Sequence, residues 1–164
     1  MLPKNQTCCF TGHRTIETAK LPAIKRCLEN IIDMLIAQGI VYYHCGGALG
    51  FDTLAGFTVL DLKKKYPAVK LIMVLPCRDQ DAKWTQKEKT VYRELLSAAD
   101  KTVYTSEEYH EGCMKKRNMY LVEMSGYCIA YLNHGRSGTG QTVRLAKERG
   151  LTVLNIYGMA KHLP

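Results

Sequence analysis

The chain has 164 residues, of which 46% are hydrophobic and 23% charged, and 23 Lys and Arg residues outweigh 15 Asp and Glu residues to give a formal charge of +8. At roughly 100–200 residues per domain, this length predicts one domain, residues 1–164, that buries its own core, so a largely disordered chain is excluded. The apolar runs are far shorter than the ~20 residues that span a bilayer, and no signal peptide opens the sequence. We therefore expect a cytoplasmic protein without a membrane partner.

The cysteines indicate neither cross-links nor metal. The sequence has seven of them, without a CxxC pair or a regular spacing. An odd, irregular set inside apolar runs predicts reduced thiols that pack as small hydrophobes, not a disulfide framework or a zinc site. We expect no metal and no cofactor. The positive charge favours an anionic partner, but the basic residues are scattered, so a phosphate-bearing ligand and nucleic acid both remain open.

Strands and helices are predicted to alternate along the chain. Residues 7–10 are β-prone, and residues 21–36 carry apolar side chains at helical spacing, with Pro22 in the first turn and Gly39 as a stop. Further strands are expected at 40–45, 69–75, 101–105, 127–132 and 151–156, and further helices at about 54–65, 84–96, 114–124 and 138–149. This alternation predicts an α/β fold with a mostly parallel sheet of about five to six strands, covered by helices on both faces.

Every unusual loop follows a predicted strand. Residues 11–14, 46–50, 76–84 and 136–141 come after the first, second, third and fifth strands. In a parallel sheet, ligands bind outside the carboxyl ends of the strands, at the point where the strand order reverses. We therefore expect these four loops to meet over one cleft.

Two of these loops combine glycines with the start of a helix, at residues 46–50 and 136–141. The unpaired N–H groups of a helix N-terminus attract phosphate, and glycine lets phosphate oxygens approach the backbone. Glycine also occurs in such turns for packing alone. Neither loop has the Gly-Lys-Ser/Thr of a P-loop or the GxGxxG pattern with a later acidic residue, which argues against an ordinary ATPase or a nicotinamide dehydrogenase.

Five side chains near these loops are candidates for ligand contact, and three of them have both a structural and a functional interpretation. His13 either bonds a phosphate or ribose or satisfies loop carbonyls, and Arg14 is expected to face the cleft. Asp52 either favours the helix dipole or accepts from a ribose hydroxyl. Trp84, the only tryptophan, either packs in the core or stacks on a base. Arg117 lies in a basic stretch that would by default be a solvated helix face.

The motifs at residues 11–14 (Thr-Gly-His-Arg) and 46–52 (Gly-Gly-Ala-Leu-Gly-Phe-Asp), with Gln80 and Trp84, resemble the YpsA-like branch of the SLOG superfamily. The resemblance covers almost the whole chain. This Rossmann-like group also includes the Lonely-Guy phosphoribohydrolases and the DNA-processing protein DprA. The resemblance implies a Rossmann-like three-layer sandwich, a crevice for nucleotides or nucleotide-derived ligands, and a homo-oligomer.

Two segments also resemble motifs of the Lonely-Guy enzymes. Their Met-His-x-Arg-Lys element is similar to residues 114–118, which keep the arginine as Arg117 but have Asn118 in place of lysine. Their Pro-Gly-Gly-x-Gly-Thr-x-x-Glu loop is similar to residues 135–142, where Thr142 stands at the catalytic glutamate. A threonine does not act as a base as a carboxylate does. The resemblance thus implies phosphate binding more than Lonely-Guy catalysis.

The sequence therefore predicts binding of a nucleotide or nucleotide-derived signalling ligand by a sensor or sequestering protein, with turnover left open. One alternative is an N-glycosidic hydrolase of nucleoside monophosphates, in which Asp52 or Glu123 replaces the lost glutamate. The other is DprA-like binding of single-stranded nucleic acid, which the net charge favours and the diffuse basic residues do not. The candidate binding residues are Thr11, Gly12, His13, Arg14, Gly46, Gly47, Ala48, Leu49, Gly50, Asp52, Gln80, Trp84, Arg117, Asn118, Ser137, Gly138, Thr139, Gly140 and Gln141.

Overall fold

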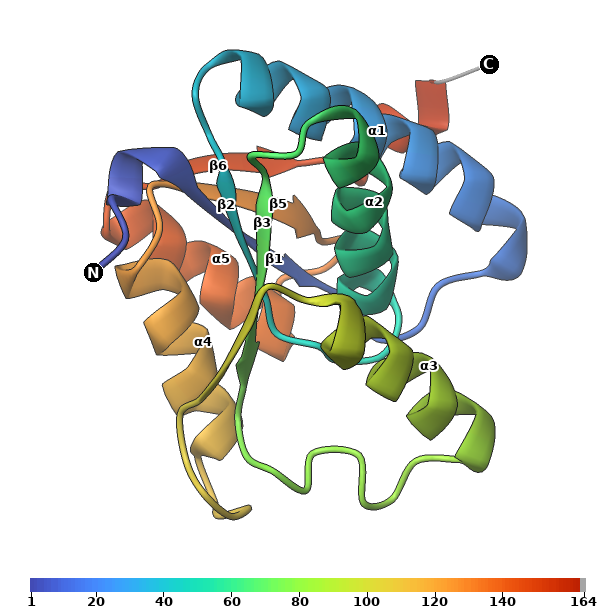
Figure 1. Ribbon diagram of the computed structural model, residues 1–164, viewed down its shortest axis with the longest axis vertical. Coiled ribbons are helices and arrows are strands. Elements are labelled where there is room, and N and C mark those ends of the chain that lie inside the picture. Colours follow the sequence, from blue (N-terminus) through green and yellow to red (C-terminus); the bar gives the residue numbers. More distant parts are fainter. Residues whose placement is uncertain (163–164) are drawn as a thin grey trace.

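Over residues 1–162, which the computed structural model describes, the chain forms a six-stranded parallel sheet and five α-helices (Figure 1). The strands are β1 (Thr7–Gly12), β2 (Tyr42–Cys45), β3 (Lys70–Leu75), β4 (Lys101–Tyr104), β5 (Tyr127–Tyr131) and β6 (Thr152–Asn155). The helices are α1 (Leu21–Ala37), α2 (Phe51–Lys65), α3 (Gln86–Ala98), α4 (Cys113–Glu123) and α5 (Gly138–Glu148), with short 3-10 helices η1 (Lys4–Gln6), η2 (Thr18–Lys20) and η3 (Met159–His162). Residues 163 and 164 of the predicted domain lie outside the described ones.

The strand order is β4-β3-β2-β1-β5-β6, and every neighbouring pair is parallel. The chain moves outward from β1 to β4 and then returns to place β5 on the other side of β1, where Phe10 pairs with Ile129. The order therefore reverses between β1 and β5. The predicted Rossmann-like α/β architecture is confirmed, and its switch point lies at the carboxyl ends of these two strands.

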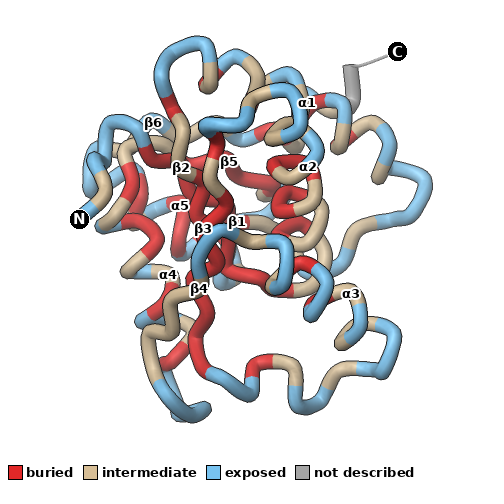
Figure 2. The backbone as a smooth tube through the Cα atoms, viewed as in Figure 1, coloured by how far each residue is buried: buried red, intermediate tan, exposed pale blue. Residues whose placement is uncertain are grey.

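The two faces of the sheet carry separate hydrophobic cores. Helices α1, α2 and α3 lie on one side of the sheet, and α4 and α5 on the other (Figure 1). Cys8 and Phe10 pack in the first core with Leu28 of α1, whereas Cys9 packs in the second with Leu121 of α4. Since successive strand residues point to opposite faces, β1 contributes to both cores, and Figure 2 shows the inner strands of the sheet as largely buried.

Helix α3 begins at Gln86, two residues after the predicted start at Trp84. Thr85 is the N-cap residue: its hydroxyl accepts from the Glu88 amide at 3.3 Å, and the Glu88 carboxylate accepts from the Thr85 amide at 2.8 Å. This reciprocal capping box fixes the first turn of the helix. Trp84 is therefore left in the loop that follows β3, next to the helix start.

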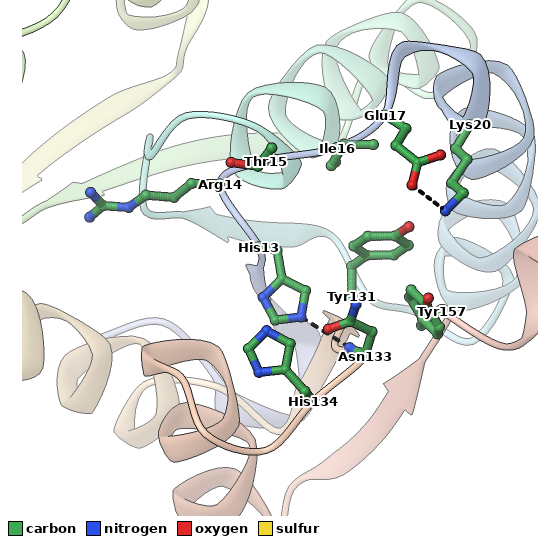
Figure 3. A pocket seen from close by; sticks show the side chains of 10 residues that line it. All are labelled: His13, Arg14, Thr15, Ile16, Glu17, Lys20, Tyr131, Asn133, His134 and Tyr157. Atoms are coloured by element: carbon green, nitrogen blue, oxygen red, sulfur yellow. Dashed lines mark hydrogen bonds and ion pairs between the residues drawn. The ribbon is translucent and has the colours of Figure 1, made fainter.

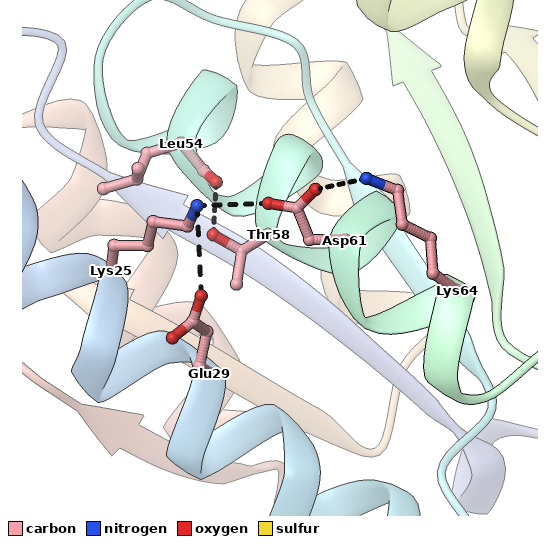
Figure 4. A network of polar contacts seen from close by, with 6 residues as sticks. All are labelled: Lys25, Glu29, Leu54, Thr58, Asp61 and Lys64. Atoms are coloured by element: carbon pink, nitrogen blue, oxygen red, sulfur yellow. Dashed lines mark hydrogen bonds and ion pairs between the residues drawn. The ribbon is translucent and has the colours of Figure 1, made fainter.

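Exposed ion pairs connect α1 and α2 (Figure 4). Asp61 of α2 accepts from Lys25 of α1 at 3.1 Å and from Lys64 at 3.2 Å, and Lys25 lies 3.9 Å from Glu29. Exposed pairs of this kind stabilise a protein by about 0–1 kcal/mol each. Packing on the sheet, more than these charges, therefore holds α2 in place.

The described residues include neither a membrane-spanning helix nor a disulfide. Within residues 1–162, no helix is both long and apolar enough to cross a bilayer. All seven cysteines, which lie between residues 8 and 128, are buried free thiols. Their burial fits the interpretation that they pack as small hydrophobes.

Candidate phosphate-binding cleft

A pocket of about 270 Å³ opens at the switch point of the sheet. Its walls are the end of β1 with the loop that follows, the first turns of α2 and α5, and one side of α4. It brings together the predicted residues Thr11, Gly12, His13, Arg14, Ala48, Asp52, Arg117, Asn118, Ser137, Gly138 and Thr139. Loops after β1, β2 and β5 therefore meet over one cleft, hereafter the phosphate cleft.

The remaining predicted residues lie beside or behind this cleft. Leu49, Gly50 and Trp84 line a neighbouring pocket, whereas Gly46, Gly47, Gln80, Gly140 and Gln141 line neither. Gln80 is buried behind the first glycine loop, where its Nε2 lies 3.5 Å from the Gly46 oxygen and 3.4 Å from the Gly47 oxygen. The loop after β3 thus supports the cleft from behind and does not line it.

Arg117 holds the first glycine loop from α4. Its Nη1 donates to the Gly46 carbonyl oxygen, and its Nε donates to Asn118 Oδ1 at 2.8 Å. A Cβ on Gly46 would overlap Arg117 Nη1 and lie 2.8 Å from Asp52 Oδ2. Glycine at this position therefore allows the guanidinium and the carboxylate to approach the backbone closely.

Asp52 and Arg117 are opposite charges in one buried place, each 5% exposed. Burial raises the pKa of Asp52, although Arg117 and a hydrogen bond from the Ala48 amide at 3.2 Å act in the other direction. Burial likewise lowers the pKa of Arg117, against the attraction of Asp52. Within the described part of the chain, Asp52 Oδ1 and Arg117 Nη2 make no hydrogen bond. The cleft wall therefore keeps one acceptor and one cationic donor for a ligand.

The first turn of α5 supplies further donors. Ser137 caps this helix, because its hydroxyl accepts from the Gly140 amide at 3.0 Å and its carbonyl from the Gln141 amide at 3.0 Å. The amides of Gly138 and Thr139 have no partner among residues 1–162 and belong to the cleft wall. Unpaired amides at a helix N-terminus attract anions. A Cβ on Gly138 would meet no atom within 4 Å, so the protein leaves the space beside this turn open.

His13 separates the phosphate cleft from a polar pocket of about 420 Å³, shown in Figure 3. Its Nε2 accepts from the Asn133 amide at 3.0 Å, which places the proton of the neutral ring on Nδ1. The ring stacks on His134 with centroids 4.8 Å apart. Burial lowers the pKa of His13, and the neighbouring His134 lowers it further. His13 is therefore held as a neutral, oriented ring at the cleft wall.

Sequence reasoning did not select two residues that shape this region. Met114 lines the cleft, and its sulfur lies 4.0 Å from Arg14 Nη2. His134 stacks on His13 in the polar pocket. The sequence holds a signal for both: Met114 is the first residue of the motif that contains Arg117, and His134 comes just before the second glycine loop.

Comparison with known proteins gives matches along most of the chain. The model of the YpsA family, described as the YspA SLOG family, matches residues 8–149. The chain is 32% identical over 138 residues to the uncharacterized SPbeta prophage-derived protein YoqJ of Bacillus subtilis, covering 76% of this chain and 81% of YoqJ. It is 27% identical to a UPF0398 protein of Halalkalibacterium halodurans, covering 77% of this chain and 68% of the relative.

Two solved structures of DNA processing protein A (DprA) share the fold. The Streptococcus pneumoniae protein matches with a TM-score of 0.66 and 18% identity, over 90% of this chain and 48% of that one. The Helicobacter pylori protein, described for its single-stranded DNA binding mode, matches with a TM-score of 0.64 and 22% identity, over 92% of this chain and 64% of that one. The chain thus spans about half to two thirds of the DprA proteins, and at these identities the likeness concerns the fold.

Proposed function

This chain belongs to the YspA SLOG family, and we propose that its phosphate cleft binds the phosphate and ribose of a nucleotide or nucleotide-derived signal. The protein then acts as a sensor of that ligand or sequesters it. One observation carries the proposal: the unpaired amides of Gly138 and Thr139 line the same small pocket as the unpaired edges of Arg117 and Asp52.

The two kinds of group suit the two parts of the ligand. The α5 amides and Arg117 offer donors to phosphate oxygens, and hydrogen bonds from a guanidinium to an anion are among the stronger ones in proteins. Asp52 Oδ1 accepts from ribose hydroxyls. Ligand pockets usually measure about 300–1,000 Å³, so the cleft of about 270 Å³ suits a ribose phosphate and leaves the rest of a nucleotide outside.

Binding of small molecules to the purified protein tests the proposal. We expect nucleotides, including ADP-ribose derivatives, to raise the melting temperature, because a ligand present at 100 times its Kd stabilises the folded state by about 2.7 kcal/mol. Mass spectrometry of small molecules released from the purified protein would identify a ligand carried from the cell. The proposal is abandoned if no nucleotide gives a thermal shift at millimolar concentration.

A second candidate function, N-glycosidic hydrolysis of nucleoside monophosphates, rests on Asp52. It is a carboxylate in the cleft wall with a raised pKa, as an acid–base group requires. Glu123, the other substitute, is exposed at the end of α4 and pairs with Arg149 at 3.4 Å. Thr142 is buried, and its hydroxyl donates to the Gly138 oxygen at 3.0 Å.

Incubation with nucleoside monophosphates separates the two functions. Hydrolysis would release free base and ribose 5-phosphate, and Asp52→Asn would abolish release while the nucleotide still binds. Arg117→Ala would weaken both binding and release, because it removes the cationic donor. Binding without release leaves the protein as a sensor or sequestering protein.

A further inference from the structure

A larger pocket, of about 750 Å³, lies on the other side of Arg14 from the phosphate cleft. It is formed by the segment that leads into α1, the start of α2 and the start of α3. Its apolar lining consists of side chains that are all left partly exposed: Ile16, Leu21, Leu49, Leu54, Phe57, Trp84 and Val91. We call this the Trp84 pocket. It is an apolar hollow that the folded chain does not fill.

The Trp84 pocket and the phosphate cleft share walls. Arg14 lines both, and the first glycine loop gives Ala48 to the cleft and Leu49 to the Trp84 pocket. The rim of the Trp84 pocket also carries Lys87 and Glu88, and the Glu88 carboxylate is already bound to the Thr85 amide in the capping box of α3. Cations at Arg14 and Lys87 favour an occupant that carries negative charge, which a phosphorylated ligand has and a purely apolar one lacks.

A buried connection joins Trp84 to the same glycine loop from behind. Gln80 Nε2 lies within 3.5 Å of the Gly46 and Gly47 oxygens and donates to the Tyr92 hydroxyl oxygen at 3.1 Å. The Tyr92 ring meets Trp84 in an edge-on contact with centroids 5.0 Å apart. The indole is therefore held in a fixed place relative to the cleft, as a stacking surface requires.

We infer that the Trp84 pocket receives the nucleobase of the ligand whose ribose phosphate occupies the phosphate cleft. This inference rests on the proposed function, and it names the missing part of the site, since the cleft has room for a ribose phosphate alone. The base stacks on Trp84 among the apolar side chains, and the ligand passes Arg14 between the two pockets. Stacking on an aromatic side chain strengthens binding by about 10-fold or more.

Trp84 is the only tryptophan of the chain, so its fluorescence reports on this pocket alone. The purified protein is titrated with AMP, ADP-ribose and ribose 5-phosphate, and saturation is followed independently by thermal shift. We expect AMP or ADP-ribose to change the tryptophan emission. Ribose 5-phosphate should bind more weakly and leave the emission unchanged, because it has no ring to place beside the indole.

Two substitutions locate the base. Trp84→Leu should weaken AMP or ADP-ribose by about 10-fold and leave the affinity for ribose 5-phosphate unaltered, and Trp84→Phe should restore part of the loss. His134→Ala probes the polar pocket on the opposite side of His13 as the alternative place for the base. Tyr109→Leu serves as the matched control, because Tyr109 is an exposed aromatic side chain that lines neither the Trp84 pocket nor the phosphate cleft. It should leave the affinity for AMP and ADP-ribose unchanged.

The inference and the proposed function fail in different ways. If AMP and ADP-ribose stabilise the protein but neither changes the emission nor responds to Trp84→Leu, the inference is overturned and the phosphate cleft stands. If the affinity for AMP and ADP-ribose falls in His134→Ala but not in Trp84→Leu, the base lies in the polar pocket, and the inference is also overturned. Self-association of the protein that is lost in Trp84→Leu, while ligand affinity stays unchanged, also overturns the inference. In that case a second copy of the chain covers the pocket. Absence of any binding at millimolar concentration overturns both.

Discussion

The two glycine-rich loops of the phosphate cleft differ in what requires their glycines. In the loop after β2, a Cβ on Gly46 would overlap Arg117, and one on Gly50, where φ is +77°, would overlap the Arg14 carbonyl. In the loop after β5, a Cβ on Gly140 would overlap the Gly135 carbonyl, whereas one on Gly138 would meet no protein atom within 4 Å. Packing thus explains the glycines of the first loop but not Gly138. The comparison teaches that a glycine without a steric requirement from its own chain is the better candidate for contact with a ligand.

The largest expected effect is on stability, from Gly46→Ala in the first loop. The added methyl displaces Arg117 and Asp52 from a buried place, and disturbing a buried charge costs about 3 kcal/mol. At about 2–4 °C per kcal/mol for a chain of this size, the melting temperature should fall by roughly 6–12 °C. Calorimetry measures the melting temperature. Gly138→Ala is the control and should change the melting temperature little, and equal losses in both variants would break the comparison.

The next effect is on binding, from Gly138→Asp in the second loop. The carboxylate enters open space, where its bulk and charge oppose a phosphate, while a negative charge in the first turn of α5 suits the helix dipole. We expect nucleotide affinity to fall by at least about 10-fold, with stability changed by ~1 kcal/mol or less. Thermal shift and titration calorimetry measure both quantities. A folded Gly138→Asp variant that still binds nucleotide would contradict the proposed cleft.

A smaller effect is expected on the pH dependence of stability, and the variant Asp52→Asn beside the first loop tests it. Burial raises the folded-state pKa of Asp52 above its unfolded value of ~3.9, so the folded chain holds this proton more tightly. The tighter hold on this proton stabilises the folded state. The contribution is complete at pH values below the unfolded-state pKa and is lost as pH rises through the folded-state pKa. The unfolding free energy of the wild type relative to Asp52→Asn should therefore decrease as pH rises from about 4. Urea unfolding at several pH values measures it.

Asp61→Asn is the matched control for this titration. Burial acts to raise the pKa of Asp61, but hydrogen bonds from Lys25 and Lys64 outweigh it and leave that pKa lowered. A lowered pKa adds stability above the unfolded pKa that is lost as pH falls through the folded pKa, so the slope has the opposite sign. Slopes of equal sign at Asp52 and Asp61 would be inconsistent with a buried carboxylate in the cleft.

The smallest effect is expected with single-stranded DNA. A bound strand contacts many phosphates, so its affinity falls steeply with salt and depends little on one glycine. The net charge of +8 should give weak, salt-sensitive binding that Gly138→Asp barely alters. Fluorescence anisotropy with a labelled oligonucleotide measures it. Submicromolar affinity near physiological salt would instead favour nucleic acid as the partner.

Much of the fold could be predicted because its signals are local. Alternating apolar runs with glycine or basic stops placed the strands and helices, and Pro22 and Gly39 marked both ends of α1. The start of α3 was placed at Trp84 instead of Gln86, because periodicity alone does not reveal that Thr85 and Glu88 cap each other. Because helix caps depend on side-chain geometry, the exact ends of the helices are harder to predict from the sequence than the presence of the helices.

The site was less predictable, because its walls depend on the order of the strands. The loops after β1, β2 and β5 are far apart in the sequence and meet because β1 lies between β2 and β5. Gln80 and Trp84 follow the same strand, yet one supports the glycine loop from behind and the other lines a different pocket. The sequence does not reveal the stacking of His13 on His134, since it follows from the β1–β5 register.

The central place of β1 has a consequence for how binding would be observed. The cleft draws on residues 10–14, 48–52, 114–121 and 137–139, and no continuous stretch of the chain contains all of its walls. Opening the sheet anywhere near β1 therefore destroys the cleft, and a ligand there opposes global unfolding more than local fraying. Bound nucleotide should slow amide hydrogen exchange in distant core strands such as β3 as well as in the loops. Exchange protection would then spread along the sheet from a ligand that touches one end of it.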